Sequence, residues 1–503
     1  MGRAAMKTQT LTPYGFFGAN GGGWEQMPQP PRWFGSSVQL CGVYPFGAGT
    51  GRPINGAPLG QDMNTGSAVC TDHDALFRSN VISSPSAFLF GLNGLGKSST
   101  AQTMIGGQVG RGLTPGIWDP IKGEHVQWAT ELGATVFSIG PRSLHQVNLL
   151  SPGPLGYAAQ RIGGKVGREL LQLARSKAID LVRTAVKIAR MDDEGGSSIT
   201  AGEDTALVAL VDTILDREPN PSTADLIRVF DSPSDRMLAL TRQRDATTFH
   251  QRFSELGETL QSLLVGEMGQ MLAGNNPVEF EPGNRGGFCF DTSSINEAET
   301  KLLSAAMLST WSLGMDAIDA HWELAQHEQR LVDEAAAAGE VYEPKVTWGG
   351  YTTLMDEFWY PIRACDGMVN LIDRLSRTNR SKGTAELKVS HSPKDLLSLR
   401  NSEDREKARG FIERSGLLLL MGLSRDDLLE LNKVRPLTPK EIATVAKFSQ
   451  SESWHGMRRQ KGAKGAPPGA GKVLLKINER VGIPVKMLRT ATQMAVHDTD
   501  LRY

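Results

Sequence analysis

Short apolar runs alternate with helical segments in the first third of the chain. Residues 86–90 form an apolar run that ends in a glycine-rich turn, and residues 97–107 fit a helix. Residues 116–119 and 135–139 have the pattern of two further strands, with a helix over 124–132 between them. Strands and helices that alternate at this spacing predict a parallel sheet with right-handed crossovers.

The pattern changes in the middle of the chain. From 157 to about 190, leucine, alanine, lysine and arginine recur at helical spacing, and similar signals cover 235–272 and 297–338. An irregular stretch at 275–291 separates the last two helical regions. We interpret residues 156–340 as a mostly helical insertion.

Sheet-like runs return after this insertion. They lie near 354–355, at 386–390 and at 417–420, and a late run covers 473–477. Residues 1–80 are rich in glycine, proline and aromatic residues, which predicts an extended lead-in. The predicted organisation is an extended segment at 1–80, a first part of an α/β core at 81–155, the helical insertion at 156–340 and a second part of the core at 341–503.

Two helix starts in the last quarter of the chain have side chains suited to capping. Ser424 precedes Asp427, and Thr438 is followed by a proline and, at the third position, by Glu441. Such residues satisfy the free backbone N–H groups of a first helical turn. We expect a helix to begin at each.

Composition and charge narrow the class of protein. With 503 residues, 40% hydrophobic and 22% charged, the chain has the profile of a soluble globular protein. The formal net charge of −1 gives no overall attraction to nucleic acid or anionic lipid, so any such contact must be local. The 4 cysteines form no CxxC pair, which suits a reducing cytosol. No signal-peptide pattern and no apolar window of about 18 residues is present.

The strongest chemical signal follows the first apolar run. The sequence GLNGLGKS at 91–98 matches GxxxxGK followed by Ser or Thr, between a strand and a helix of small residues. Its glycines let backbone N–H groups turn toward a β-phosphate, Lys97 supplies charge to the β- and γ-phosphates, and the Ser98 hydroxyl ligates Mg²⁺. The alternative is a chance glycine turn, which the intact strand–loop–helix context disfavours. The predicted ATP-binding residues of this loop are Gly91, Leu92, Asn93, Gly94, Leu95, Gly96, Lys97, Ser98 and Ser99.

Hydrolysis also needs a carboxylate for Mg²⁺ and a group that orients the attacking water. The adjacent acids Asp356 and Glu357 supply both at the end of the run at 354–355. The preceding residues are more polar than those of most buried strands, and a solvated acidic pair at a helix start is the alternative. Asp119 and Glu124, just past the second predicted strand, are placed near the γ-phosphate by one interpretation, in which Asp119 is assigned to ATP binding, and a turn with an aspartate cap is the alternative.

Two further features bear on a motor function. Lys97 and Asp356 are separated by the whole helical insertion, whereas compact kinases and small GTPases place both motifs in much shorter chains, so a motor-type ATPase is favoured. Arg374, Arg377 and Arg380 recur every three residues and share a helix face. They either act as an arginine finger on a neighbouring subunit's nucleotide or form a solvated basic face.

The remaining candidates are weaker. His321 and His327 do not have the spacing of metal ligands on one helix face, and we expect both at the surface. The basic, glycine-rich stretch at 450–471 either grips a phosphate backbone or is a solvated linker.

Several motifs occur in a fixed order along the chain. They are GLNGLGKSS at 91–99, WDPIKGEH at 118–125, NLLSP at 148–152, FDTSSI at 290–295, MDEFW at 355–359, RLSRTNRSKG at 374–383, VSHSPKDL at 389–396 and VLLKINERVGIPVK at 473–486. This ordered set resembles the large ATPase of conjugative type IV secretion systems, within the wider clade of hexameric P-loop translocases. The likeness covers roughly residues 40–500. Where that family often places a glutamine after a threonine, this chain has Ser390 followed by His391.

The resemblance implies an α/β P-loop NTPase of the RecA-like translocase type, with a mostly parallel central sheet. It implies a catalytic glutamate at Glu357, Mg²⁺ contacts at Ser98 and Asp356, and a catalytic arginine at Arg377 or Arg380 that acts on a neighbouring subunit. ATP and Mg²⁺ are the implied cofactors. A homo-hexamer, secretion-channel subunits as partners, and a cytoplasmic position at the inner face of the cell membrane without insertion are also implied.

We therefore predict an ATPase whose hydrolysis powers conjugative DNA or protein transfer or the assembly of a type IV secretion channel. Two alternatives stay open. A DNA-pumping or coupling translocase would bind DNA itself, with residues 450–472 as its groove. A nucleotide-binding scaffold would assemble a secretion complex with little turnover. DNA-stimulated hydrolysis would favour the translocase, and nucleotide binding without hydrolysis would favour the scaffold.

Overall fold

A computed structural model describes most of the chain as two compact units, residues 1–52 and 53–503. The first unit contains an antiparallel hairpin of β1 (Leu11–Thr12) and β2 (Gly15–Phe16). The described residues are 11–12, 15–16, 53–191, 198–218, 221–274, 278–280, 283–364, 369, 372–373, 379–399, 401–449 and 469–496.

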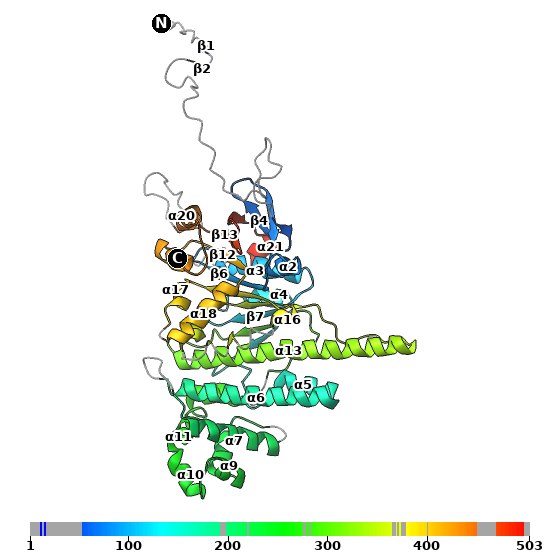
Figure 1. The fold of residues 1–503 in the computed structure, drawn as a ribbon, viewed down its shortest axis with the longest axis vertical. Helices are drawn as coiled ribbons and strands as arrows, with labels where there is room; N and C mark the ends of the chain where they lie inside the picture. The colour runs from blue at the N-terminus through cyan, green and yellow to red at the C-terminus, as the bar shows by residue number, and fades with distance from the viewer. Residues whose placement is uncertain are drawn as a thin grey trace. The chain divides into compact units, whose positions relative to one another are not determined.

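A 12-stranded sheet forms the centre of the second unit, in the order β3-β5-β4-β14-β13-β12-β6-β11-β10-β7-β9-β8 (Figure 1). Every neighbouring pair from β12 to β8 is parallel, and most pairs on the other side are antiparallel. The predicted α/β fold with a mostly parallel central sheet is confirmed. The strands are β3 (Ile54–Asn55), β4 (Pro58–Asp62), β5 (Ala68–Thr71), β6 (Ser86–Phe90), β7 (Thr114–Asp119), β8 (Thr135–Ser138), β9 (Phe288–Asp291), β10 (Tyr351–Met355), β11 (Ala385–Ser390), β12 (Leu417–Leu420), β13 (Lys472–Ile477) and β14 (Ile483–Met487).

The central strands are apolar because both of their faces are covered. On β6, Phe88 and Phe90 pack into the hydrophobic core on one face, whereas Ala87 and Leu89 belong to the core on the other face. Side chains alternate across a strand, so a strand buried on both sides is a continuous apolar run. Residues 86–90 therefore form a strand although polar and apolar residues do not alternate along it.

Helices from different parts of the chain cover the two faces. One face of the sheet, which carries the smaller hydrophobic core, is covered by α2 (His73–Arg78), α3 (Lys97–Val109) and α4 (Val126–Glu131). The other face carries the helices between β8 and β10, and Figure 1 shows α13, α6 and α7 stacked progressively farther from the sheet. These helices are α5 (Gly153–Ile162), α6 (Gly164–Ala189), α7 (Ala201–Arg217), α8 (Asp225–Asp231), α9 (Asp235–Leu240), α10 (Ala246–Arg252), α11 (Ser254–Ser262), α12 (Gly266–Leu272) and α13 (Thr300–Ala338).

The last third of the second unit adds short helices around the parallel strands. Ser424 and Thr438 cap two of them, and Thr438 forms a reciprocal capping box with Glu441, so both predicted helix starts are confirmed. Among the described residues, no helix is both long and apolar enough to cross a bilayer. These helices are α14 (Trp359–Ala364), α16 (Asn379–Lys382), α17 (Lys394–Leu397), α18 (Ser402–Arg414), α19 (Arg425–Asn432), α20 (Pro439–Phe448) and α21 (Ala491–Val496).

The expectation of an extended lead-in is wrong for residues 54–78. These residues form β3, β4, β5 and α2, and β4 pairs antiparallel with β14 from the far end of the chain. Gly60 permits close strand packing, because a Cβ at this position would lie 2.0 Å from the carbonyl oxygen of Lys486. Glycine at such a position permits an approach that any side chain would block.

The expectation of irregular structure throughout 275–291 is also wrong at its end. Residues 288–291 form β9, which pairs with β7 on one side and β8 on the other. The strand is short, and the preceding Gly287 has a φ of 72° with its Cα so close to the Pro115 carbonyl that a Cβ would clash. A glycine that permits close packing was thus read as a break in structure.

Candidate functional site

Three segments meet where parallel strands end. The glycine loop follows β6, His391 follows β11, and Asp356 follows β10. Phe90 pairs with Ser390, and Lys388 pairs with Met355, so the three strand ends lie at one edge of the sheet. The carboxyl edge of a parallel sheet is where open α/β folds bind ligands.

The backbone of the glycine loop requires glycine at two positions and a close approach at a third. Gly94 and Gly96 have φ values of 77° and 92°, which are left-handed and costly for residues with a Cβ. A Cβ at Gly91 would lie 2.7 Å from the Cβ of Met421. Gly96 then begins the 13-residue helix α3, whose first N–H groups and positive dipole end face the loop.

Lys97 is buried at the start of α3 and lies between two side chains. Its ammonium donates to Asn93 Oδ1 at 3.0 Å and lies 2.9 Å from Nδ1 of His391. Burial lowers the pKa of Lys97, and the nearby carboxylates of Glu357 and Asp356 oppose this shift. The loop therefore holds a desolvated cation near the predicted catalytic acid Glu357 and the predicted Mg²⁺ ligand Asp356.

Glu357 is held by two protein groups. His391 Nε2 lies 3.1 Å from Glu357 Oε1, and the Trp359 indole N–H donates to Oε2 at 2.6 Å. Glu357 has a φ of 46°, a left-handed conformation that is uncommon for a residue with a side chain. Strained backbone of this kind persists where the surrounding contacts impose it. Lys97, His391, Glu357 and Trp359 thus form one continuous chain of contacts.

Asp356 contacts a buried histidine that the sequence analysis did not single out. His125 Nε2 lies 3.2 Å from Asp356 Oδ2, and burial lowers the pKa of His125, but the Asp356 hydrogen bond and the charge of Asp119 raise it to about 9 overall. Burial raises the pKa of Asp356, and its hydrogen bond with His125 brings the net shift downward. The contact with His125 therefore favours the charged form of the Asp356 carboxyl group.

Asp119 lies at the end of β7, behind this pair. Its carboxylate accepts the backbone N–H of His125 at 2.5 Å, which is the turn-capping contact. Burial raises the pKa of Asp119 to about 6. A direct contact between Asp119 and nucleotide stays a prediction.

Ser98 and Ser99 contact groups that come from distant segments. The Ser98 hydroxyl donates to Glu124, and Arg489 donates to the Ser99 hydroxyl at 2.7 Å. Arg489 follows β14 and carries no motif, so nothing in the sequence pattern indicated it. The hydroxyl of Ser98 and the carboxylate of Asp356 are oxygen donors of the kind that Mg²⁺ prefers, and they fit a Mg²⁺ site at this edge.

Strand β10 is a central strand of the sheet although its sequence is unusually polar. The hydroxyl of Thr352 donates to Gln108 Oε1 at 2.5 Å, and that of Thr353 donates to the Ala385 carbonyl at 3.3 Å. All five residues of the strand are buried. Its polarity is therefore satisfied internally, and the acidic pair lies at the end of a central strand.

The predicted arginine finger lies largely outside the described residues. Arg374 and Arg377 are outside them, and so is the side chain of Arg380, whose backbone is in α16. In the same helix Lys382 pairs with Asp319 of α13, and Asp319 also lies 3.2 Å from Lys177 of α6. Of the basic stretch at 450–472, only residues 469–472 are described.

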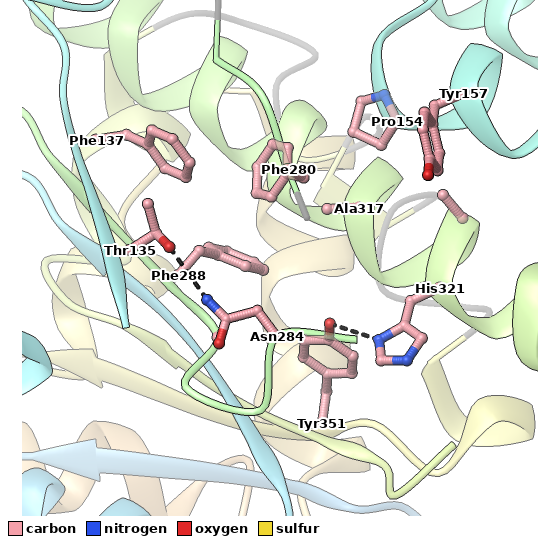
Figure 2. A pocket seen from close by; sticks show the side chains of 12 residues that line it. Thr135, Phe137, Pro154, Tyr157, Phe280, Asn284, Phe288, Ala317, His321 and Tyr351 are labelled. Atoms are coloured by element: carbon pink, nitrogen blue, oxygen red, sulfur yellow. Dashed lines mark hydrogen bonds between the residues drawn. The ribbon is translucent and has the colours of Figure 1, made fainter. Parts of the chain in front are cut away.

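The opposite, amino edge of the sheet carries a pocket with different chemistry (Figure 2). His321 lies in it and is buried, so the expectation of a surface histidine is wrong. Its Nδ1 lies 2.9 Å from the hydroxyl of Tyr351, and its Nε2 lies 3.1 Å from the carbonyl of Thr347. The pocket is lined by Thr135, Phe137, Pro154, Tyr157, Phe280, Asn284, Gly287, Phe288, Ala317, Ala320, His321 and Tyr351.

The chain was compared with solved structures and with known sequences. VirB4 of Thermoanaerobacter pseudethanolicus matches with a TM-score of 0.62 and 16% identity, over 89% of this chain and 99% of VirB4. The plasmid coupling protein TrwB in complex with ADP and Mg²⁺ matches with a TM-score of 0.46 and 12% identity, over 90% of this chain and 98% of TrwB. No protein-family model and no curated protein matches the sequence. The resemblance inferred from the ordered motifs is thus confirmed at the level of the fold by VirB4.

Proposed function

We propose that this protein is a Mg²⁺-dependent P-loop ATPase that powers conjugative DNA or protein transfer or the assembly of a type IV secretion channel. The observation that carries the proposal is the chain of contacts from Lys97 through His391 to Glu357. It brings the cation of a phosphate loop and a carboxylate able to orient water to one edge of the sheet. A chance glycine turn or a solvated acidic pair would not account for this arrangement.

The loop residues would bind the phosphates of ATP. Backbone N–H groups of 91–98 and the ammonium of Lys97 provide the positive field, and Ser98 with Asp356 would hold Mg²⁺. When bound, Mg²⁺ neutralises charge on the β- and γ-phosphate oxygens. The hydrogen bond from the buried ring of His125 would keep the Asp356 carboxylate charged and oriented for this role.

Glu357 would orient the attacking water. Its carboxylate is fixed on both oxygens, by His391 and by the indole of Trp359, and its backbone is held in a left-handed conformation. Holding a general base in one geometry is a main source of rate enhancement in phosphoryl transfer. The second candidate is a nucleotide-binding scaffold with little turnover. It is favoured by the same two contacts, because each carboxylate oxygen that binds a protein group has less capacity to bind water.

The secretion role rests on the shared fold with VirB4 and on the ordered motifs. The proposed role includes assembly into a homo-hexamer, contact with channel subunits, and a cytoplasmic position at the membrane. Arg377 and Arg380 would then contact a nucleotide held by a neighbouring subunit. Mixed rings of Arg380→Ala and Lys97→Ala protein test this, because each variant lacks a different half of a shared site and mixing should restore part of the turnover.

ATP hydrolysis by the purified chain tests the proposal directly. Lys97→Ala should abolish turnover and weaken ATP binding, because the phosphates lose their side-chain cation. Lys165→Ala is the matched control, since Lys165 lies on α6 with an 84% exposed side chain. Wild-type turnover by Lys97→Ala would contradict the ATPase proposal, and ATP binding by the wild type without any turnover would favour the scaffold.

A further inference from the structure

We propose that His391 is the positioning residue for Glu357, acting as a neutral imidazole that connects occupancy of the phosphate loop to the catalytic carboxylate. The inference rests on the proposed ATPase function and deepens it. It is carried by two distances on one ring, 2.9 Å from Nδ1 to Lys97 Nζ and 3.1 Å from Nε2 to Glu357 Oε1.

The two contacts together select one protonation state of the ring. A lysine ammonium has three N–H donors and no acceptor, so Nδ1 must accept from Lys97. The proton of a neutral ring is then on Nε2, which donates to the carboxylate of Glu357. A doubly protonated ring would place an N–H against the ammonium, and the other neutral tautomer would place a lone pair against the carboxylate. The geometry therefore assigns the Nε2–H tautomer.

Of the three residues Lys97, His391 and Glu357, Lys97 is the one that a phosphate ligand would bind. Its ammonium contacts both Asn93 and His391. A bound β/γ-phosphate would attract the ammonium more strongly than a neutral ring nitrogen does. Nδ1 would then lose its donor, whereas Nε2–H would still hold Glu357. Occupancy of the loop would thus change the contacts of the ring that holds Oε1 of Glu357.

The surroundings of the ring make protonation disruptive. Glu357 and Asp395 face the ring as carboxylates, Trp359 lies 6.3 Å from it between ring centroids, and Lys97 faces it as a cation. A proton on Nδ1 would set two cationic groups 2.9 Å apart and break the contact with Lys97.

Glutamine is the informative replacement. Its side-chain oxygen accepts and its NH₂ group donates, so it reproduces the polarity of the Nε2–H tautomer without being titratable. Single-turnover hydrolysis at saturating ATP should be about 10- to 100-fold slower in His391→Ala, the range found for groups that orient a functional ligand. His391→Gln should recover most of that loss, because the amide can make both contacts. ATP affinity should change little in either variant.

The matched control is His321→Gln, because His321 makes the same type of paired contacts at the opposite edge of the sheet. It should leave turnover per folded molecule unchanged. Unaffected hydrolysis in His391→Ala, or equal losses in His391→Ala and His391→Gln, would overturn the inference while leaving the ATPase proposal intact.

A second measurement tests the tautomer without turnover. Ring ¹⁵N resonances assigned by comparison with His391→Gln should show a protonated Nε2 in nucleotide-free protein, and a shift of Nδ1 on addition of a non-hydrolysable ATP analogue. A protonated Nδ1 in the nucleotide-free protein would overturn the inference. A wild-type protein that hydrolyses no ATP would contradict the proposed function instead.

Discussion

Two histidines at opposite edges of the sheet make nearly the same hydrogen bonds and are expected to do different work. His391 lies between Lys97 and Glu357, and His321 lies between the Tyr351 hydroxyl and the Thr347 carbonyl. In both rings Nε2 faces an acceptor, so both favour the Nε2–H tautomer. The difference is in the partners. Those of His391 are charged, and one of them, Lys97, would also bind a phosphate ligand, whereas those of His321 are neutral groups of the protein itself.

The surroundings of the two rings follow the same division. At the carboxyl edge, charged side chains converge on a glycine loop and Glu357 has a left-handed backbone. At the amino edge, aromatic rings pack around His321, including Tyr351 and Trp348 at 5.6 and 5.4 Å between ring centroids. The comparison teaches that hydrogen bonds alone do not mark a functional histidine. A functional histidine is recognised when one of its partners, here Lys97, could bind a ligand instead of the ring.

The largest expected effect separates the edges by activity. Glu357→Gln keeps the shape of the side chain and loses the charge that orients water, so turnover should fall about 10²- to 10⁴-fold. ATP binding and the free energy of unfolding should stay close to those of the wild type. Hydrolysis assays and titration with a fluorescent ATP analogue measure both. A variant that hydrolyses ATP normally would remove the distinction between the edges.

The next effect separates the edges by stability. His321→Leu leaves the Tyr351 hydroxyl and the Thr347 carbonyl without their partner in a buried site, which should lower the free energy of unfolding by about 2 kcal/mol. Turnover per folded molecule should not change. Denaturant unfolding measures the loss, with His327→Leu on the same helix as the control. Reduced turnover with unchanged stability would show that the amino edge also takes part in catalysis.

The smallest effect is a pH dependence of stability. Burial lowers the pKa of His321 from its ordinary value of 6.5, so the unfolded chain takes up a proton there that the folded chain resists. The free energy of unfolding should therefore fall as the pH drops below about 6.5, by at most about 1.4 kcal/mol per pH unit for one proton. His321→Gln should flatten part of this slope. His73, whose pKa burial lowers to about 4, would still contribute in the variant. An unchanged slope would show that His321 titrates freely.

The sequence predicted the parts of the site that depend on local pattern. The apolar run of β6, the glycine loop and the start of α3 at Lys97 are consecutive, so their order alone indicates a phosphate loop. The pairing of Glu357 with His391 was not predictable, because it depends on the register of β10 beside β11. Arg489 reaches Ser99 only through the pairing of β14 with β13 and β4. Contacts set by register and long-range pairing carry no short motif.

Burial also changed the meaning of single residues. Thr352 and Thr353 made β10 look too polar for a central strand, yet their hydroxyls are bonded inside the protein. Gly60 and Gly287 suggested loose structure, yet each permits contact with a neighbouring backbone. In both cases the residue type indicates what the position tolerates, and only the three-dimensional neighbours show why.

The join between the two ends of the second unit has a consequence for biosynthesis. Strand β4 finds its partner in β14, and the carbonyl of Leu95 in the glycine loop accepts from the backbone of Gly471. During synthesis, β14 and Gly471 emerge from the ribosome several hundred residues after β4 and the glycine loop. Until then the nascent chain has an open sheet edge and an unfinished loop. Pairings of such long sequence separation fold slowly and leave apolar strands exposed in the interval, so we expect the newborn chain to need a chaperone.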